Sequence, residues 1–221
     1  MGTLYLVRHG QASLGAENYD QLSPLGERQC RRLGEYLLAR GQQFDHVITG
    51  TLQRHVQSQD AIAQGLGSRH EPLRRPGLNE YDSAAVIATV AGEPAHGPVT
   101  EDRYRRHMRF LRQGLEAWMS GSAQPAGMPS YRDFAAGVAR VLDEVRTMDG
   151  HILLVSSGGP ISAAMGHVLG VEPVVTIDLN MRIRNSSVTE FTFNAKRHLL
   201  NTYNALPHLD GADYADWITY A

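Results

Sequence analysis

The stretch LYLVRHG at residues 4–10 decides the fold, because an apolar run ends there on an arginine, a histidine and a glycine. Such a run predicts a short buried strand, and Gly10 allows a sharp turn after it. The guanidinium group of Arg8 can bind two phosphate oxygens at once, while the imidazole of His9 can attack phosphorus or transfer a proton. A histidine at a strand end is more often structural, so the rest of the chain must decide its role.

Strand and helix patterns alternate along the rest of the chain. Alternation of this kind predicts an α/β fold, a three-layer sandwich whose mostly parallel central sheet carries helices on both faces. Ser23 and Ser130 have the residue type and spacing of helix N-caps. The expected strands are 4–7, 44–49, 70–74, 151–156, 176–184 and 187–193, and the expected helices are 23–41, 51–64, 104–120, 130–145 and 160–170.

The composition changes at about residues 82–129, where two stretches rich in small residues and proline flank one amphipathic helix. This segment is predicted to be an inserted helical lid within a single domain that spans residues 1–221. The arginines beside the apolar stripe of that helix are interpreted as a solvated face, since charge runs on helices usually face water. They are Arg105, Arg109 and Arg112.

Composition narrows the function classes. The formal net charge of −2 argues against a nucleic-acid partner. Cys30 is the only cysteine, so no internal disulfide can form. No apolar run approaches the length of a membrane span, and the chain enters its first strand without a signal-like segment. We therefore expect a cytoplasmic protein with no membrane partner. The sequence does not define an oligomeric state, and a homodimer is compatible with it.

Polar and charged side chains follow several of the predicted strands. Arg8 and His9 follow the first strand, Arg54 lies in the first turn of the helix after the second, and Glu80 follows the third extended segment. Ser157-Gly158 opens the helix after the central strand, where free N–H groups favour an anion. Ligands of open α/β sheets bind beyond the carboxyl ends of the strands. The pattern therefore predicts a phosphate site with an acid beside it.

Seven segments, in this order, resemble the histidine phosphatase superfamily, also called the phosphoglycerate mutase-like family. Residues 8–10 match its R-H-G signature, and 155–161 match V-S-H-G-G-P-I at all but one position. The others are LSPLGERQ at 22–29, TLQR at 51–54, LNE at 78–80, RNSSV at 184–188 and YNALPHL at 203–209. Together these motifs cover nearly the whole chain and are far more specific than any one of them.

The resemblance implies roles for individual residues. His9 would attack phosphorus and form a phosphohistidine, with its other ring nitrogen donating to a nearby acceptor. Arg8, Arg54, Ser157 and the Gly158 N–H would hold the phosphoryl oxygens. Glu80 would protonate the leaving group and then activate water. The resemblance implies no metal and no cofactor, and the substrate would be a small phosphorylated metabolite.

Ser157 departs from the family pattern, because the family usually has a second, phosphate-binding histidine there. A serine brings one hydrogen bond and no charge. Three interpretations stay open: a slower or differently tuned phosphatase, a pseudoenzyme that binds a phosphorylated ligand, and an engineered substitution. On sequence alone, Ser157→His would be expected to restore a charged donor and raise activity.

A second departure concerns the substrate. Phosphoglycerate mutases carry an asparagine six residues after the histidine, where this chain has Gly15, and Asn18 could replace it only after a shift of the loop. This difference favours a phosphatase over mutase-type phosphotransfer, which remains an alternative. Gln11 and Ser13 are further candidates for lining the pocket. The histidines at 55 and 208 are interpreted as structural or surface residues.

Overall fold

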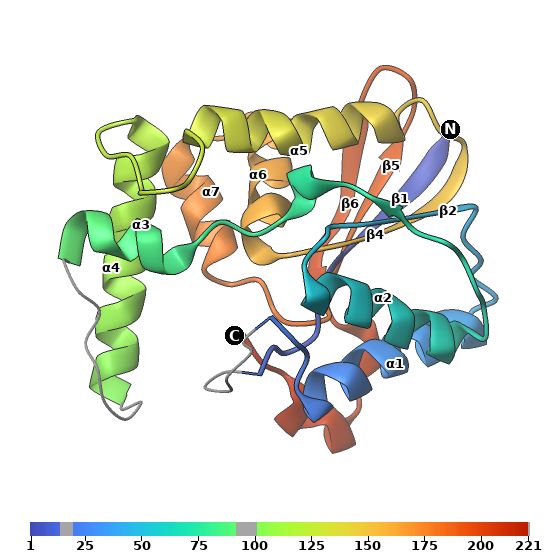
Figure 1. Cartoon of the computed structure of the whole chain (residues 1–221). Coiled ribbons are helices and arrows are strands. Elements are labelled where there is room, and N and C mark those ends of the chain that lie inside the picture. Colours follow the sequence, from blue (N-terminus) through green and yellow to red (C-terminus); the bar gives the residue numbers. More distant parts are fainter. Residues whose placement is uncertain (14–19, 92–100, 221) are drawn as a thin grey trace.

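The computed structural model describes residues 1–13, 20–91 and 101–220 (Figure 1). Within them lies a six-stranded sheet in the order β3-β2-β4-β1-β5-β6. The strands are β1 (Gly2–Arg8), β2 (His46–Thr49), β3 (Leu73–Arg74), β4 (Gly150–Ser156), β5 (Val188–Phe193) and β6 (His198–Ala205). The pairs among β3, β2, β4 and β1 are parallel, whereas β5 and β6 pair antiparallel. The predicted α/β fold with a mostly parallel sheet is confirmed.

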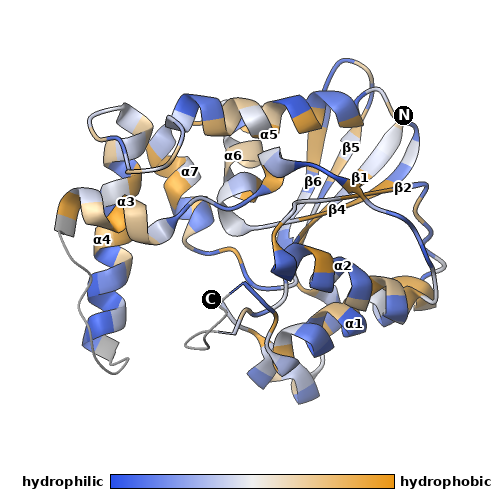
Figure 2. Cartoon of the chain, in the orientation of Figure 1, coloured by the Kyte–Doolittle hydropathy of each residue, from blue (hydrophilic) through white to orange (hydrophobic). Residues whose placement is uncertain are grey.

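Helices cover both faces of this sheet. Helices α1 (Pro24–Ala39) and α2 (Gln53–Leu66) pack on the face that receives Val7, and α5 (Tyr131–Val145) and α6 (Gly158–Leu169) pack on the face that receives Leu4 and Leu6. This division follows from the alternation of side chains along β1. Strands β2 and β4 are largely hydrophobic in Figure 2, as expected for central strands that are buried on both faces.

The two predicted N-caps are confirmed. The Ser23 hydroxyl accepts a hydrogen bond from the Gly26 N–H at 3.1 Å and begins α1, with Pro24 in the first turn. The Ser130 hydroxyl accepts from the Asp133 N–H at 3.1 Å and begins α5. The Gly10 N–H donates to the Ser58 hydroxyl at 3.1 Å and the Leu22 N–H donates to the Gln57 side chain at 2.8 Å, so residues 10 and 22 both contact α2.

Helices α1 and α2 approach each other through glycines. A Cβ atom on Gly34 would lie 2.2 Å from the Ile62 carbonyl oxygen, which is too close for any side chain. We expect Gly34→Ala to lower the free energy of unfolding by about 1–3 kcal/mol, because the backbones must separate. Gly137→Ala in α5 is the matched control, since its Cβ would lie 3.5 Å from the nearest heavy atom. Chemical denaturation measures both variants, and equal stability would contradict this account of the contact.

The structure corrects the predicted C-terminal strands. Residues 176–184, predicted as a strand, begin inside α7 (Pro173–Asn180). Their β-branched residues suggested a strand, but Pro173 at the helix start and the burial of Thr176 and Ile177 favour the helix. The prediction at 187–193 is confirmed as β5, and the edge strand β6 was not predicted. Its residues are half-buried or exposed, which gives a weak sequence signal.

The segment after Glu80 holds two helices where one was predicted. Helix α3 (Ser83–Ala91) precedes α4 (Glu101–Ser120), and Asp82 accepts hydrogen bonds from the N–H groups of Ala84 and Ala85 at the start of α3. The short, mostly apolar α3 shows no polar face, which explains why periodicity missed it. Both helices share a hydrophobic cluster around the buried Trp118 and lie beside the sheet layers in Figure 1. Arg112, interpreted as solvated, pairs with Asp178 of α7.

No helix in the described part of the chain is both long enough and apolar enough to cross a bilayer.

Candidate active site

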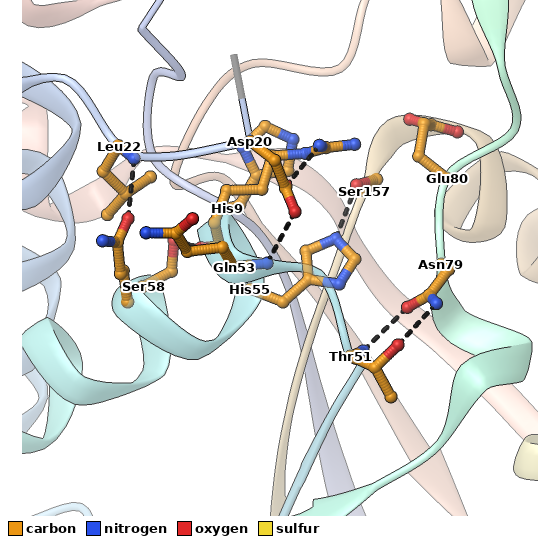
Figure 3. Close-up of polar contacts among 12 residues, drawn as sticks. His9, Asp20, Leu22, Thr51, Gln53, His55, Ser58, Asn79, Glu80 and Ser157 are labelled. Carbon is orange, nitrogen blue, oxygen red and sulfur yellow. Dashed lines mark hydrogen bonds and ion pairs between the residues drawn. The ribbon is translucent and has the colours of Figure 1, made fainter. Parts of the chain in front are cut away.

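Five of the predicted site residues line one cavity of about 370 Å³ at the carboxyl ends of the parallel strands: Arg8, His9, Arg54, Glu80 and Gly158. Arg8 is the last residue of β1, and Arg54 lies in the first turn of α2. Glu80 follows the short 3-10 turn Pro76–Leu78, and Gly158 begins α6. The close-up in Figure 3 shows how His9, Glu80 and Ser157 lie around this point.

His9 is held as a neutral imidazole in a defined tautomer. Its Nδ1 atom lies 2.6 Å from the Gly10 carbonyl oxygen, which can only accept, so Nδ1 carries the proton. The unprotonated nitrogen is therefore Nε2. Burial lowers the pKa of His9 well below its ordinary value, and the charges of Arg8 and Arg54 lower it further. At neutral pH the Nε2 atom of His9 therefore carries a lone pair and no proton.

The two arginines of the site are oriented by partners far away in the sequence. The Nη1 atom of Arg8 donates to the carbonyl oxygens of Ile183 and of Tyr220, the latter at 2.7 Å. The Nη1 atom of Arg54 donates to the Asp20 carboxylate at 2.7 Å, and Asp20 also accepts from the N–H at the start of α2. The sequence missed Asp20 and Tyr220, because neither belongs to a local pattern around its arginine.

Glu80 lies against the N-terminus of α6. Its carboxylate oxygens accept from the Gly159 N–H at 3.0 and 3.2 Å. Burial raises the pKa of Glu80, while the Gly159 N–H and the two arginines oppose that rise. The net effect favours the protonated carboxyl at a higher pH than for an ordinary glutamate. Such a group can donate a proton to a leaving oxygen and take one from water.

Ser157 and His55 form a buried pair beside this cavity. Neither side chain has exposed surface, and the His55 Nε2 lies 2.6 Å from the Ser157 Oγ. The His55 ring also lies beside the His9 ring, with centroids 5.8 Å apart. The interpretation of His55 as a surface or merely structural residue is therefore incomplete, because the structure buries it against the site. His208 is also buried, and its Nε2 lies 2.9 Å from the Ser186 hydroxyl, outside the cavity.

Gln11 and Ser13, the two remaining predicted pocket residues, bond to the residues just before α1. The side-chain oxygen Oε1 of Gln11 accepts from the Ser23 hydroxyl at 2.8 Å, and the Ser13 hydroxyl donates to the Leu22 carbonyl at 3.0 Å. Among the described residues, neither Gln11 nor Ser13 lines the cavity. Residues 15 and 18, on which the comparison with mutases depends, lie outside the described residues.

Helix α4 also lines the cavity, and the sequence did not predict which of its residues do so. Its contribution combines cationic, aromatic and apolar side chains: Arg103, Tyr104, His107, Met108 and Leu111. The remaining residues that line the cavity are Tyr81, Ser83, Asn180, Met181 and Tyr220. The arginines at 105, 109 and 112 do not line the cavity. In the described parts of the chain, no three His, Cys, Asp or Glu side chains are grouped so as to hold a metal ion.

Comparison with known proteins agrees with this geometry. The model of the histidine phosphatase superfamily, branch 1, matches residues 4–206. A 2,3-bisphosphoglycerate-dependent phosphoglycerate mutase from Methylorubrum extorquens is 28% identical over 177 residues, covering 75% of this chain and 78% of the relative.

Two solved structures share the fold at low identity. One is phosphoserine phosphatase from Entamoeba histolytica, 19% identical, with a TM-score of 0.65 over 95% of this chain and 100% of that chain. The other is a mycobacterial glucosyl-3-phosphoglycerate phosphatase, 20% identical, with a TM-score of 0.66 over 92% of this chain and 98% of that chain.

Proposed function

Because the chain belongs to the histidine phosphatase superfamily, we propose that it hydrolyses a small phosphomonoester, without a metal ion, through a phosphohistidine on His9. The observation that carries the proposal is the state of His9. Its Nδ1–H is bound to the Gly10 carbonyl, so its Nε2 lone pair is available inside a cavity that also holds Arg8 and Arg54. Neutral imidazole beside two guanidinium groups suits attack on a phosphate ester.

The reaction proceeds in two steps. The His9 Nε2 attacks phosphorus, the ester P–O bond breaks, and the leaving oxygen takes a proton from the Glu80 carboxyl. A water molecule then attacks the phosphohistidine, gives a proton to the Glu80 carboxylate, and releases inorganic phosphate. This second step restores neutral His9 and protonated Glu80. Arg8 and Arg54 supply the positive charge that offsets the phosphoryl oxygens in both transition states.

The test is a panel of phosphate monoesters assayed in the presence of a metal chelator. A phosphatase releases inorganic phosphate from at least one ester, whereas mutase-type transfer yields an isomeric ester and no phosphate. The uncharged Ser157 favours a second candidate, a pseudoenzyme that binds a phosphorylated ligand. Such a protein would bind vanadate but release neither alcohol nor phosphate across the panel.

The buried pair changes the result expected for Ser157→His. Because the His55 Nε2 lies 2.6 Å from the Ser157 Oγ and both side chains are fully buried, an imidazole at position 157 would overlap His55. We expect Ser157→His alone to lose activity and stability. Adding His55→Ala should give at least about 10-fold more activity than the single variant, because the second substitution frees space for a charged donor. Steady-state kinetics decide this, and a single variant as active as the double one would contradict the overlap.

A further inference from the structure

We propose that His55 is a positioning residue. Its Nε2–H donates a hydrogen bond to the Ser157 oxygen and so orients the Ser157 O–H to donate a hydrogen bond to an oxygen of the bound phosphoryl group. The pair would then take over the contact of the single histidine that the family carries at this position. The inference rests on the phosphoryl site proposed at His9. It concerns binding of the phosphoryl group and so can be tested separately from turnover.

His55 and Ser157 are in direct contact. The distance of 2.6 Å between the His55 Nε2 and the Ser157 Oγ is that of a short hydrogen bond, and both residues are fully buried. The two residues come from different elements, the first turn of α2 and the residue before α6. Ser157 makes no capping hydrogen bond to α6, although serine at that position commonly does. Its hydroxyl is thus directed to His55 and not to the helix backbone.

The surroundings of the His55 ring bear on which of its nitrogens carries the proton. The Nδ1 atom of His55 is buried and has no hydrogen-bond partner among the described residues. A proton on Nδ1 would be a buried donor with no acceptor whether or not a ligand is bound, which is costly. With the proton on Nε2, His55 donates to the Ser157 Oγ, and the Ser157 O–H needs another acceptor. A bound oxyanion supplies that acceptor, so the Nε2–H tautomer is the one expected in the ligand-bound protein. A hydroxyl that accepts a hydrogen bond is also a stronger donor.

Ser157 lies directly beside the proposed phosphoryl site. It is fully buried and does not itself line the cavity, but the next residue, Gly158, does, and a Cβ on Gly158 would lie 3.8 Å from Glu80 Oε2 and 4.0 Å from Arg8 Nε. On the other side, the His55 ring lies beside the ring of the proposed nucleophile His9. In the view of Figure 3, Ser157 lies between His9 and Glu80. An oxyanion bound there by Arg8 and Arg54 is the acceptor that the buried hydroxyl lacks.

The charge state of His55 agrees with a neutral donor pair. Burial lowers the pKa of His55 to about 3, and the adjacent Arg54 lowers it as well. His55 therefore acts by orienting a hydroxyl and adds no positive charge. Arg8 and Arg54 already provide the positive charge. The His55–Ser157 pair adds a hydrogen-bond donor that is oriented before the ligand binds, and such a donor stabilises an oxyanion without reorganisation.

The test measures the affinity of the full chain for vanadate, a phosphoryl mimic, by titration calorimetry. Four variants are compared with the natural sequence: Ser157→Ala, His55→Leu, His55→Gln and His55→Leu/Ser157→Ala. Leucine fills the space of the imidazole without a donor, whereas the glutamine amide places an N–H near the position of Nε2. His208→Leu is the matched control, since it removes a second buried histidine bound to a serine outside the cavity.

We expect Ser157→Ala to weaken vanadate binding by about 10²-fold, and His55→Leu by about 10-fold, because the hydroxyl is then free to turn away. The double variant should be no weaker than Ser157→Ala, since His55 acts only through Ser157. His55→Gln should recover most of the affinity lost in His55→Leu, and His208→Leu should lower stability without changing affinity. In turnover assays the same losses should fall on kcat more than on KM.

Several results would overturn the inference. One is that His55→Leu and His55→Gln bind vanadate equally well. Another is that the affinity loss of the double variant equals the product of the losses of the two single variants. A third is that the natural sequence binds no vanadate. A nitrogen NMR spectrum of the vanadate-bound natural sequence with the His55 proton on Nδ1 would also overturn it, even if His55→Leu failed to fold. Vanadate binding that follows the expected pattern, without phosphate release from any ester, would contradict the proposed phosphatase and leave the His55–Ser157 pair supported.

Discussion

His9→Asn is expected to abolish the phosphorylated intermediate and to lower phosphatase activity by about 10⁴-fold or more, as loss of a covalent nucleophile does in other hydrolases. Asparagine is the informative substitution, because its amide can still donate to the Gly10 carbonyl as Nδ1 does now. It lacks an atom equivalent to Nε2. The loss would therefore report on nucleophilic attack and not on a collapsed loop.

The measurement is intact mass at alkaline pH after brief incubation with a reactive aryl phosphate. The natural sequence should gain one phosphoryl group, and acid should remove it, since phosphohistidine is acid-labile. His208→Asn serves as a control for the loss of a buried histidine outside the cavity. Turnover without any labelled species, or labelling that survives in His9→Asn, would remove His9 from the proposed role.

Glu80→Gln is expected to lower the rate on alkyl phosphates by about 10²–10⁴-fold, and to affect aryl phosphates with acidic leaving groups much less. Alkyl leaving oxygens need a proton in the transition state, whereas acidic phenols leave without one. Glutamine keeps an oxygen that can accept from the Gly159 N–H, so the packing against α6 is preserved. Rates on a series of esters with graded leaving-group acidity measure the effect.

The pH profile gives a second reading of the same variant. Burial raises the pKa of Glu80, so its proton persists above the ordinary range and is lost as the pH rises through that raised value. Rates on alkyl esters should fall over that window, and the fall should be absent in Glu80→Gln. On the acid side the rate should persist below pH 6.5, because the lowered pKa of His9 keeps the nucleophile unprotonated. If Glu80→Gln lowers the rates on alkyl and aryl esters equally, Glu80 has a binding role instead. Glu71→Gln is the control, because Glu71 is exposed and lies outside the cavity.

The sequence by itself determined the central architecture and the main residues of the cavity. The strand before His9, the helix starts at Ser23 and Ser130, and the alternation of strands and helices from β1 to β3 all follow from local patterns of a few residues. Since parallel strands end at one edge of a sheet, the residues after them had to meet. Arg8, His9, Arg54, Glu80 and Gly158 do line one cavity.

Only the tertiary structure decided how these residues are oriented, because the partners are distant in the chain. Arg54 and Asp20 are 34 residues apart, His55 and Ser157 are 102 apart, and Arg8 and Tyr220 are 212 apart. Local periodicity carries no information about such pairs. The same reason explains the error at α7, where burial of Thr176 and Ile177 against other elements outweighed the strand preference of the β-branched residues.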